Sequence, residues 1–331
     1  MSFRTRLLAV CGTLASLLVL FLFGTLFSPE RVQARTSSQP LLPGLSPEKI
    51  DEIEITEEGA STRLLRTARG WEIPRGTSAY PASADRIETF LRTVAGLRRT
   101  SRVTSAPQHL SELGFSGDRS RLLVLHQSGA ADIVLQVGKR GPSGDADYVR
   151  LDGQDLVYLA RGNLAFFLLQ KPPYWYELHV LPNNVQGTTI SSITVSGALD
   201  AAGAAGVALR GGYSLRRPSA DKPDQWIVGG DARPADRVTA GAMASSLANL
   251  EGVDFAEPKA AAGGSGTSGA GTGRLDIAVT TFEGKKYSLN VTRGPEPGQV
   301  RITTDWSHWT YVVNDLPLQR AVLPESSLRG H

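Results

Sequence analysis

Hydrophobic and polar residues form two patterns along this chain: one long apolar stretch near the start, followed by short alternating runs. Residues 7–27, which begin with Leu7 and end with Phe27, contain no charged residue and are rich in Leu, Val and Phe. A helix of this length reaches about 31 Å, which matches a hydrocarbon core of about 30 Å. Because Arg4 and Arg6 precede the stretch, the positive-inside rule predicts a cytoplasmic N-terminus and an extracytoplasmic remainder.

Two other interpretations of this stretch are open. A cleaved signal peptide would end after Ala34, where Val32, Gln33 and Ala34 form an acceptable cleavage site, but its apolar core is normally only about 7–15 residues long. A lipoprotein anchor at Cys11 is less favourable because the bulky Val10 precedes the cysteine. The pattern therefore favours a single membrane-spanning helix that contacts the lipid bilayer.

Beyond this stretch the pattern changes from that of a linker to that of a globular protein. Residues 28–45 contain several Pro and Ser residues and are expected to form a flexible stalk. Folded structure is expected from Ser46, where Ser-Pro-Glu is typical of a helix start. Short alternating runs then predict antiparallel strands. These runs are Ile53 with Ile55, Leu64 with Leu65, Trp71 with Ile73, and residues 122–126, 133–137, 147–151 and 156–160.

One helix is predicted within this series of strands. Its start is expected at Asp85, because Asp85 and Glu88 resemble a capping box. Its apolar face comprises Ile87, Phe90, Leu91, Val94 and Leu97. Three basic residues, Arg98, Arg99 and Arg102, are expected to close the helix, where positive charge favours the C-terminal dipole. Contact with anionic lipid head groups or an acidic partner is the alternative role for these arginines.

The order strands, helix, strands then recurs in the second half, which predicts two copies of one unit. The matching pairs are Ile53 with Ile193, Ile55 with Val195, Leu65 with Leu215, Arg66 with Arg216, Trp71 with Trp226 and Asp85 with Asp236. The predicted fold class is α+β: an N-terminal single transmembrane helix followed by two tandem repeats of a strand-helix-strand antiparallel-sheet unit. The expected boundaries are 1–27 for the cytoplasmic tail and membrane helix, 28–45 for the stalk, 46–182 and 183–325 for the repeats, and 326–331 for a tail.

Composition and charge exclude several classes of function. The 35 basic and 32 acidic residues leave a net charge of only +3, which disfavours dedicated nucleic-acid binding. The single cysteine excludes disulfide frameworks and thiolate metal sites built by this chain alone. Residues 260–273 are almost entirely Ala, Gly, Ser and Thr and are expected to form a flexible insertion. Gly264, Gly266 and Gly269 match Gly-x-Gly-x-x-Gly there only because glycine is so frequent, so no nucleotide is expected.

No pattern in the sequence points to catalysis. None of the five histidines forms a close pair typical of a metal site, and neither Gly-x-Ser-x-Gly nor a P-loop is present. The acidic pairs Glu57-Glu58 and Asp145 with Asp147 lie in glycine-rich turns, where solvated loop charges explain them. We therefore expect a protein that is not an enzyme, with no catalytic, cofactor-binding or metal-binding residues. A hydrolase whose site is assembled from distant residues is a third possibility.

Two aromatic clusters are the best candidates for contacts with a partner or ligand, because flat rings beside polar groups stack on sugars or anchor proteins. The first comprises Tyr174, Trp175 and Tyr176, and the second comprises Trp306, Trp309 and Tyr311. The alternative is that they fill the core. In a strand, Trp306 would face the opposite side from Trp309 and Tyr311. The first cluster could instead join the two repeats.

Several of these features together resemble the domain of unknown function 4340 (DUF4340) family. The residues that carry the resemblance are Ser46-Pro47-Glu48, Ile50-x-x-Ile53-x-Ile55, a Leu-x-Arg to Trp step that ends at Trp71, Ala84-Asp85 and Leu113-Gly114-Phe115. The family is similar in setting to auxiliary components of gliding-motility-type ABC transport systems. The resemblance implies a periplasm-facing accessory or scaffold protein of the bacterial inner membrane, with ABC-type transporter subunits as partners. A membrane-tethered glycan- or cell-wall-binding module that uses the aromatic clusters is the alternative.

Overall fold

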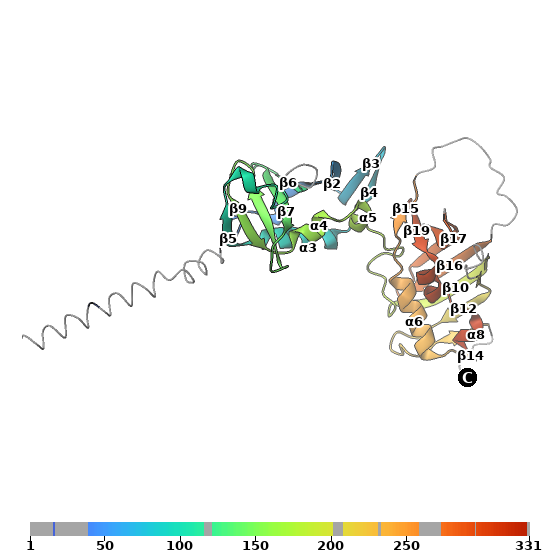
Figure 1. Cartoon of the computed structure of the whole chain (residues 1–331). Coiled ribbons are helices and arrows are strands. Elements are labelled where there is room, and N and C mark those ends of the chain that lie inside the picture. The colour runs from blue at the N-terminus through green and yellow to red at the C-terminus, as the bar shows by residue number, and fades with distance from the viewer. Residues whose placement is uncertain are drawn as a thin grey trace, which may run out of the picture. The chain divides into compact units, whose positions relative to one another are not determined.

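The computed structural model describes residues 39–115, 121–200, 208–230, 233–257, 273–294 and 296–329, together with Ser16 (Figure 1). The chain divides into two compact units, of which unit 1 ends at Glu177 and unit 2 begins at Leu178. The membrane segment expected at residues 7–27 lies outside the described residues except for Ser16, and so does the insertion at 260–273 except for Gly273. No helix in the described part of the chain is both long and apolar enough to cross a bilayer.

Unit 1 is built around one sheet, as the alternating runs predict. In β1 (Ile50–Glu57) the residues Ile53 and Ile55 are buried, whereas Glu52 and Glu54 are only partly covered. The other strands are β2 (Ala60–Thr67), β3 (Gly70–Arg75), β4 (Ser78–Pro81), β5 (Arg98–Thr104), β6 (Arg121–Gln127), β7 (Ile133–Arg140), β8 (Ala146–Leu151) and β9 (Val157–Arg161). Among the described residues they form an antiparallel sheet in the order β4-β3-β2-β1-β6-β7-β8-β9-β5.

From residue 39 onward, the described part of unit 1 also contains three helices and two short 3₁₀ turns. The turns are Pro47–Lys49 and Pro107–His109, and the helices are α3 (Ala84–Ala95), α4 (Leu164–Leu168) and α5 (Pro172–Trp175). Helix α3 forms where the apolar spacing predicts it, and it buries Ile87, Phe90, Leu91 and Val94. Its N-cap is Ser83, whose side chain makes no capping hydrogen bond. The helix therefore owes its place to the burial of its apolar face.

The arginines expected to close α3 lie in a strand instead. The helix ends at Ala95, before Gly96, and glycine is a poor helix former. Arg98, Arg99 and Arg102 belong to β5, which pairs with β9 at the edge of the sheet. The predicted interaction with the helix C-terminus is therefore wrong. The Arg99 guanidinium stacks over the ring of Tyr158 at 4.7 Å from its centroid.

Unit 2 repeats the strand order of unit 1. Its strands are β10 (Ile190–Leu199), β11 (Leu209–Arg210), β12 (Tyr213–Arg216), β13 (Ile227–Val228), β14 (Arg233–Pro234), β15 (Asp254–Phe255), β16 (Arg274–Thr281), β17 (Lys286–Arg293), β18 (Gln299–Thr304) and β19 (Thr310–Asn314). Its helices are α6 (Arg237–Ala248), α7 (Asp315–Ala321) and α8 (Glu325–Leu328). The described strands follow the order β14-β13-β12-β10-β16-β17-β18-β19-β15, with β11 beside β10. The chain is thus a mixed α/β protein built mostly of antiparallel sheet, as predicted.

The first strand of each sheet carries a β-bulge at the same place. The register shifts between Ile50 and Glu52 where β1 meets β6, and between Ile190 and Ser192 where β10 meets β16. A bulge inserts one extra residue and thereby changes which side chains face the core. Both first strands therefore bury their isoleucines in the same register.

The pairing in the sheets also corrects one of the sequence correspondences. Leu64 lies opposite Ile53 and Leu215 lies opposite Ile193, and all four side chains are fully buried. Leu64 is therefore the counterpart of Leu215, and the match of Leu65 with Leu215 is wrong by one residue. The matching arginine in unit 2 shifts in the same way, from Arg216 to Arg217.

The expected stalk is shorter on its C-terminal side than predicted. Residues 28–38 lie outside the described part, but residues 39–45 pack against unit 1. The backbone N–H of Leu41 donates to the Leu97 carbonyl at 2.8 Å, and the Leu41 side chain is fully buried. Burial of Leu41 and Leu42 and a hydrogen bond from the Arg99 N–H to the Gln39 carbonyl at 3.0 Å both hold this segment.

The boundary between the two units and the start of the C-terminal tail also differ from the expected ones, because the residues there pack into unit 2. Residues 178–182 belong to unit 2, where the N–H of Val180 donates to the Leu250 carbonyl at 2.9 Å. The expected tail at 326–331 includes most of α8, whose Leu328 is fully buried. The Leu328 carbonyl accepts a hydrogen bond from the N–H of Asp236 at 2.9 Å, so the described part of this segment belongs to the fold.

Candidate functional site

The first predicted aromatic cluster lies mostly in the core of unit 1. Trp175 and Tyr176 are fully buried, and Tyr174 is half-buried. The ring of Trp175 lies 5.4 Å from that of Phe90 on α3, between centroids, and Tyr176 lies 5.5 Å from Tyr80. Trp175 and Tyr176 therefore do not form a surface for a ligand in this structure, because their rings are used to pack the helix on the sheet.

In the second predicted cluster, Trp306 and Trp309 lie on the turn between β18 and β19, and Tyr311 lies in β19. Because Trp306 and Trp309 stand outside the strands, the alternation expected of a strand does not apply to them. Trp309 is half-buried and Tyr311 is only 2% exposed, and both rings pack against Phe255. Trp306 is 40% exposed. Of the six predicted contact residues, Trp306 is the most exposed.

A stacked Arg–Trp pair in unit 1 was not singled out as a candidate from the sequence. The Arg66 guanidinium lies 4.8 Å from the ring centroid of Trp71. Its Nη1 donates to the Glu48 carbonyl at 2.8 Å and its Nη2 to the Pro47 carbonyl at 3.5 Å. Arg66 thus ties the segment before β1 to β3 through one cation–π contact and two charged hydrogen bonds.

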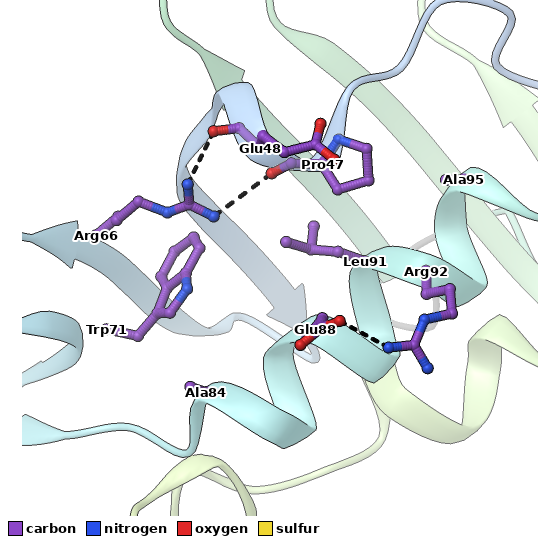
Figure 2. A pocket seen from close by; sticks show the side chains of 9 residues that line it. All are labelled: Pro47, Glu48, Arg66, Trp71, Ala84, Glu88, Leu91, Arg92 and Ala95. Carbon is purple, nitrogen blue, oxygen red and sulfur yellow. Dashed lines mark hydrogen bonds and ion pairs between the residues drawn. The ribbon is translucent and has the colours of Figure 1, made fainter.

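This Arg–Trp pair forms one wall of an open cavity of about 460 Å³ (Figure 2). The opposite wall is α3, with Leu91 and the ion pair between Glu88 and Arg92, whose atoms lie 2.7 Å apart. Hydrogen bonds from its own backbone N–H and from the Ser46 hydroxyl lower the pKa of Glu48, which keeps this lining carboxylate ionised. The described lining thus combines apolar side chains with the charged groups of Glu48, Arg66, Glu88 and Arg92.

Unit 2 contains the same Arg–Trp pair but packs it more tightly. The Arg217 guanidinium lies 4.2 Å from the Trp226 ring centroid, and its Nη1 and Nη2 donate to the Thr188 and Gly187 carbonyls at 2.8 and 3.1 Å. A Cβ at Gly187 would lie 2.9 Å from the Cα of Ser245 on α6, so this segment lies directly against the helix. The N-caps Ser83 of α3 and Asp236 of α6 correspond, so the match of Asp85 with Asp236 is wrong by two residues and Arg92 is the counterpart of Ser245. Unit 1 thus has the bulkier Pro47 and Arg92 where unit 2 has Gly187 and Ser245.

One acidic residue expected in a solvated turn is buried instead. Asp147 lies in β8 and is 1% exposed. Its Oδ2 accepts a hydrogen bond from the backbone N–H of Ala165 at the start of α4, at 2.9 Å, and its Oδ1 lies 4.0 Å from the Arg140 Nε. A carboxylate that satisfies a helix N-terminus has a structural role, and Asp147 does not line the cavity beside Trp71.

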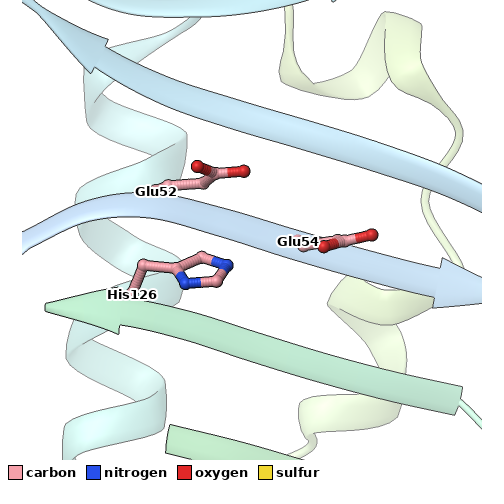
Figure 3. Close-up of side chains that lie close together, drawn as sticks. All are labelled: Glu52, Glu54 and His126. Carbon is pink, nitrogen blue, oxygen red and sulfur yellow. The ribbon is translucent and has the colours of Figure 1, made fainter. Parts of the chain in front are cut away.

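The structure also brings together a possible metal-binding group that the sequence does not reveal. Glu52 and Glu54 on β1 and His126 on β6 each place one ligand atom so that all lie within 4.8 Å of one another (Figure 3). All three side chains are half-buried. His126 is isolated in the sequence, and it meets Glu52 only because β1 and β6 pair in that register.

The described residues form a mixed α/β protein with two antiparallel sheets of the same strand order, each with a stacked Arg–Trp pair. Residues 71–264, more than half of the chain, match the family described as Domain of unknown function (DUF4340). The chain therefore belongs to the DUF4340 family, as its sequence pattern indicates. No curated protein matches the chain, and no solved structure does.

Proposed function

We propose that this protein is a membrane-anchored, extracytoplasmic accessory or scaffold component of an ABC-type envelope transport system, and that it is not an enzyme. The observation that carries the proposal is that the most distinctive charged side chains bind the protein's own backbone. Arg66 and Arg217 bind backbone carbonyls beside Trp71 and Trp226, and the carboxylate of Asp147 binds a helix N-terminus. Because these charged side chains stabilise the fold, they support a scaffold protein that presents its surfaces to other proteins.

The two units are tandem repeats of one ancestral unit in this proposal. Three independent features support a duplication: the strand order, the bulge in the first strand and the Arg–Trp pair that binds the preceding segment. Unrelated sheets can share a strand order, but a shared bulge position and a shared side-chain contact make coincidence a poor explanation. A doubled unit offers two related but unlike surfaces to a multisubunit partner.

The anchor in this proposal is the apolar stretch at residues 7–27, inserted in the bacterial inner membrane with the N-terminus in the cytoplasm. Reporter fusions after residue 27 test the orientation. Activity of a periplasmic reporter and retention of the chain in membranes after an alkaline wash are the expected results. A cytoplasmic reporter signal, or release of the chain by the wash, would contradict the anchor.

Cross-linking in intact membranes tests the partner class. A photo-reactive residue at Phe166 in unit 1 and another at Val238 in unit 2 would sample two exposed apolar positions, which are 42% and 70% exposed. We expect mass spectrometry of the products to recover transporter subunits, and a chain without residues 7–27 is the control. If neither position yields a membrane-protein partner, the scaffold proposal fails.

A tethered glycan- or cell-wall-binding module is the second candidate, and the exposed ring of Trp306 is the observation that favours it. Trp306→Ala should abolish retention on cell-wall polysaccharide without changing the fold. Val238→Ala removes an exposed apolar side chain elsewhere in unit 2 and is the matched control. If the unaltered protein is not retained, this candidate is excluded.

A further inference from the structure

The outward face of β1 and β6 presents three metal-ligating side chains. Glu52 and Glu54 alternate with the buried Ile53 and Ile55, so both project from the face opposite the core. Glu52 lies directly opposite His126 in the β1–β6 register. Residues opposite each other on neighbouring strands share a face, which explains why one ligand atom of each side chain lies within 4.8 Å of the others (Figure 3).

Each of these side chains has one outer partner that fixes it on one side. The Nε of Arg63 donates to Glu52 Oε1 at 2.7 Å, and the Ser61 hydroxyl donates to Glu54 Oε1 at 2.9 Å. His126 Nδ1 lies 3.0 Å from Asp132 Oδ2. Metal-ligating histidines and carboxylates characteristically have outer partners of this kind, which set the tautomer and the orientation of the ligand.

These outer contacts leave one ligand atom of each side chain available. Both contacts of Arg63 are made with Oε1 of Glu52, and the Ser61 contact is made with Oε1 of Glu54. Within the described residues, Oε2 of each glutamate and Nε2 of His126 make no hydrogen bond or ion pair. One oxygen atom of each glutamate and one ring nitrogen of the histidine are thus free of these outer contacts.

We infer that Glu52, Glu54 and His126 bind a divalent transition-metal ion, with Zn²⁺ as the ion that the ligand set fits best. Zn²⁺ accepts imidazole nitrogen and carboxylate oxygen together, whereas Ca²⁺ and Mg²⁺ favour oxygen alone and Cu⁺ favours sulfur. Three protein ligands leave a fourth position for water. This inference concerns unit 1 and does not depend on the proposed function.

The side chains can reach coordination distances without a shift of the backbone. Zn–N and Zn–O bonds of about 2.0–2.2 Å place tetrahedral ligand atoms about 3.3–3.6 Å apart. The present separations of up to 4.8 Å must therefore shrink by at most about 1.5 Å. Glutamate has three rotatable side-chain bonds, so rotation of Glu52 and Glu54 supplies this movement while Asp132 holds the imidazole.

The corresponding positions of unit 2 provide an internal comparison. Ser192 and Thr194 alternate with Ile193 and Val195 on β10 as the two glutamates do on β1, and Ser192 lies opposite Thr280. Hydroxyl groups at these three positions are weak ligands for Zn²⁺. The sheet frame is thus shared, but these three positions carry metal-ligating side chains in unit 1 and hydroxyl groups in unit 2, which predicts one ion per chain.

Calorimetric titration of the metal-stripped full-length protein with ZnCl₂ in detergent tests the inference. We expect one Zn²⁺ per chain. Glu54→Gln and His126→Asn each remove a ligand and should abolish this binding, whereas Asp132→Asn removes an outer partner and should weaken it about 10- to 100-fold. His109→Asn is the matched control, because His109 also lies beside a carboxylate, that of Glu112, but belongs to no such group. Circular dichroism establishes that each variant is folded.

Replacement of Zn²⁺ by Co²⁺ tests the coordination itself. A tetrahedral Co²⁺ ion with nitrogen and oxygen ligands gives intense visible absorption bands, and these bands should be present in the unaltered protein and in His109→Asn but absent in Glu54→Gln. Failure of the unaltered protein to bind Zn²⁺ would overturn the inference. So would binding that Glu54→Gln and His126→Asn leave unchanged, because the ion would then lie elsewhere.

Discussion

The guanidinium of Arg217 lies 4.2 Å from the ring centroid of Trp226, and the two side chains are 5% and 2% exposed. Burial lowers the pKa of Arg217, and the charge is compensated by the ring and by the Thr188 and Gly187 carbonyls. The equivalent Arg66 stacks on Trp71 from a solvent-exposed position. The same contact therefore exists in a buried and an exposed form within one chain.

Replacement of these two arginines should have unequal effects. Arg217→Ala removes a desolvated cation–π contact and charged hydrogen bonds to two carbonyls, so we expect a loss of about 2–4 kcal/mol from the unfolding free energy of unit 2. Arg66→Ala removes the exposed counterpart and should cost about 0.5–1 kcal/mol. Denaturant unfolding of both variants measures the difference. Equal losses would show that burial does not control the strength of this pair.

The N-cap of α6 predicts a dependence of stability on pH. Hydrogen bonds from Thr239, whose backbone N–H donates to Asp236 Oδ1 at 2.8 Å, lower the pKa of Asp236 below its ordinary value of 3.8. A lowered folded-state pKa contributes stability that is complete above the unfolded-state value and is lost as pH falls through the folded-state value. We therefore expect the melting temperature of unit 2 to fall as pH drops below 3.8.

Asp236→Asn separates the cap from its charge. Asparagine also caps helices, so this variant should keep most of the stability at neutral pH and lose the part of the acid sensitivity that Asp236 provides. Ser83→Ala at the N-cap of α3 is the control, because the Ser83 side chain makes no capping hydrogen bond. Thermal melts across the acidic range compare the three proteins, and an unchanged acid profile in Asp236→Asn would contradict the assignment.

Close packing of the segment before β10 predicts intolerance at Gly187. A Cβ there would lie 2.7 Å from Ser245 Oγ and 2.9 Å from its Cα, and the Cα belongs to the helix backbone and cannot rotate away. Gly187→Ala should therefore destabilise unit 2 by about 1–3 kcal/mol. Gly241→Ala within α6 is the matched substitution, because nothing lies within 4 Å of its Cβ position. It should stabilise the helix by about 0.5–1 kcal/mol, and chemical denaturation measures both changes.

The buried carboxylate of Asp147 predicts a further difference between neighbouring residues. Asp147→Ala leaves the Ala165 N–H without its acceptor in a buried position, so we expect a loss of about 1–3 kcal/mol from the unfolding free energy of unit 1. Asp145, two residues earlier, forms an exposed ion pair with Arg161, and Asp145→Ala should leave stability nearly unchanged. Equal stability of Asp147→Ala and the unaltered protein would contradict the role assigned to this carboxylate.

Alternation of apolar residues was sufficient to predict most of the sheet of unit 1. The runs around Ile53, Trp71 and residues 122–126 all form strands, because each buries one face on a common core. Strand β5 was missed because none of its side chains is buried, so its sequence lacks the alternation. Its hydrogen bonds to β9 hold it at the sheet edge, and such pairing leaves no signal in the local sequence.

The candidate sites depended on information that the sequence lacks. Whether an aromatic ring faces the core depends on packing between distant segments, and Trp175 is buried by Phe90 from another element. Likewise, the meeting of Glu52 with His126 depends on a register between strands that are far apart in the chain. The Arg66–Trp71 contact, in contrast, is local, because the two residues lie opposite each other in the neighbouring strands β2 and β3.

The shared bulge makes the outward positions of the first strands interchangeable. The bulge gives β1 and β10 the same register with their neighbouring strands. Ser192, Thr194 and Thr280 therefore lie at the positions equivalent to Glu52, Glu54 and His126. This shared register allows the two units to differ in surface chemistry while the hydrophobic layer beneath stays similar. Outward side chains of one unit should therefore be exchangeable for those of the other without redesign of the interior.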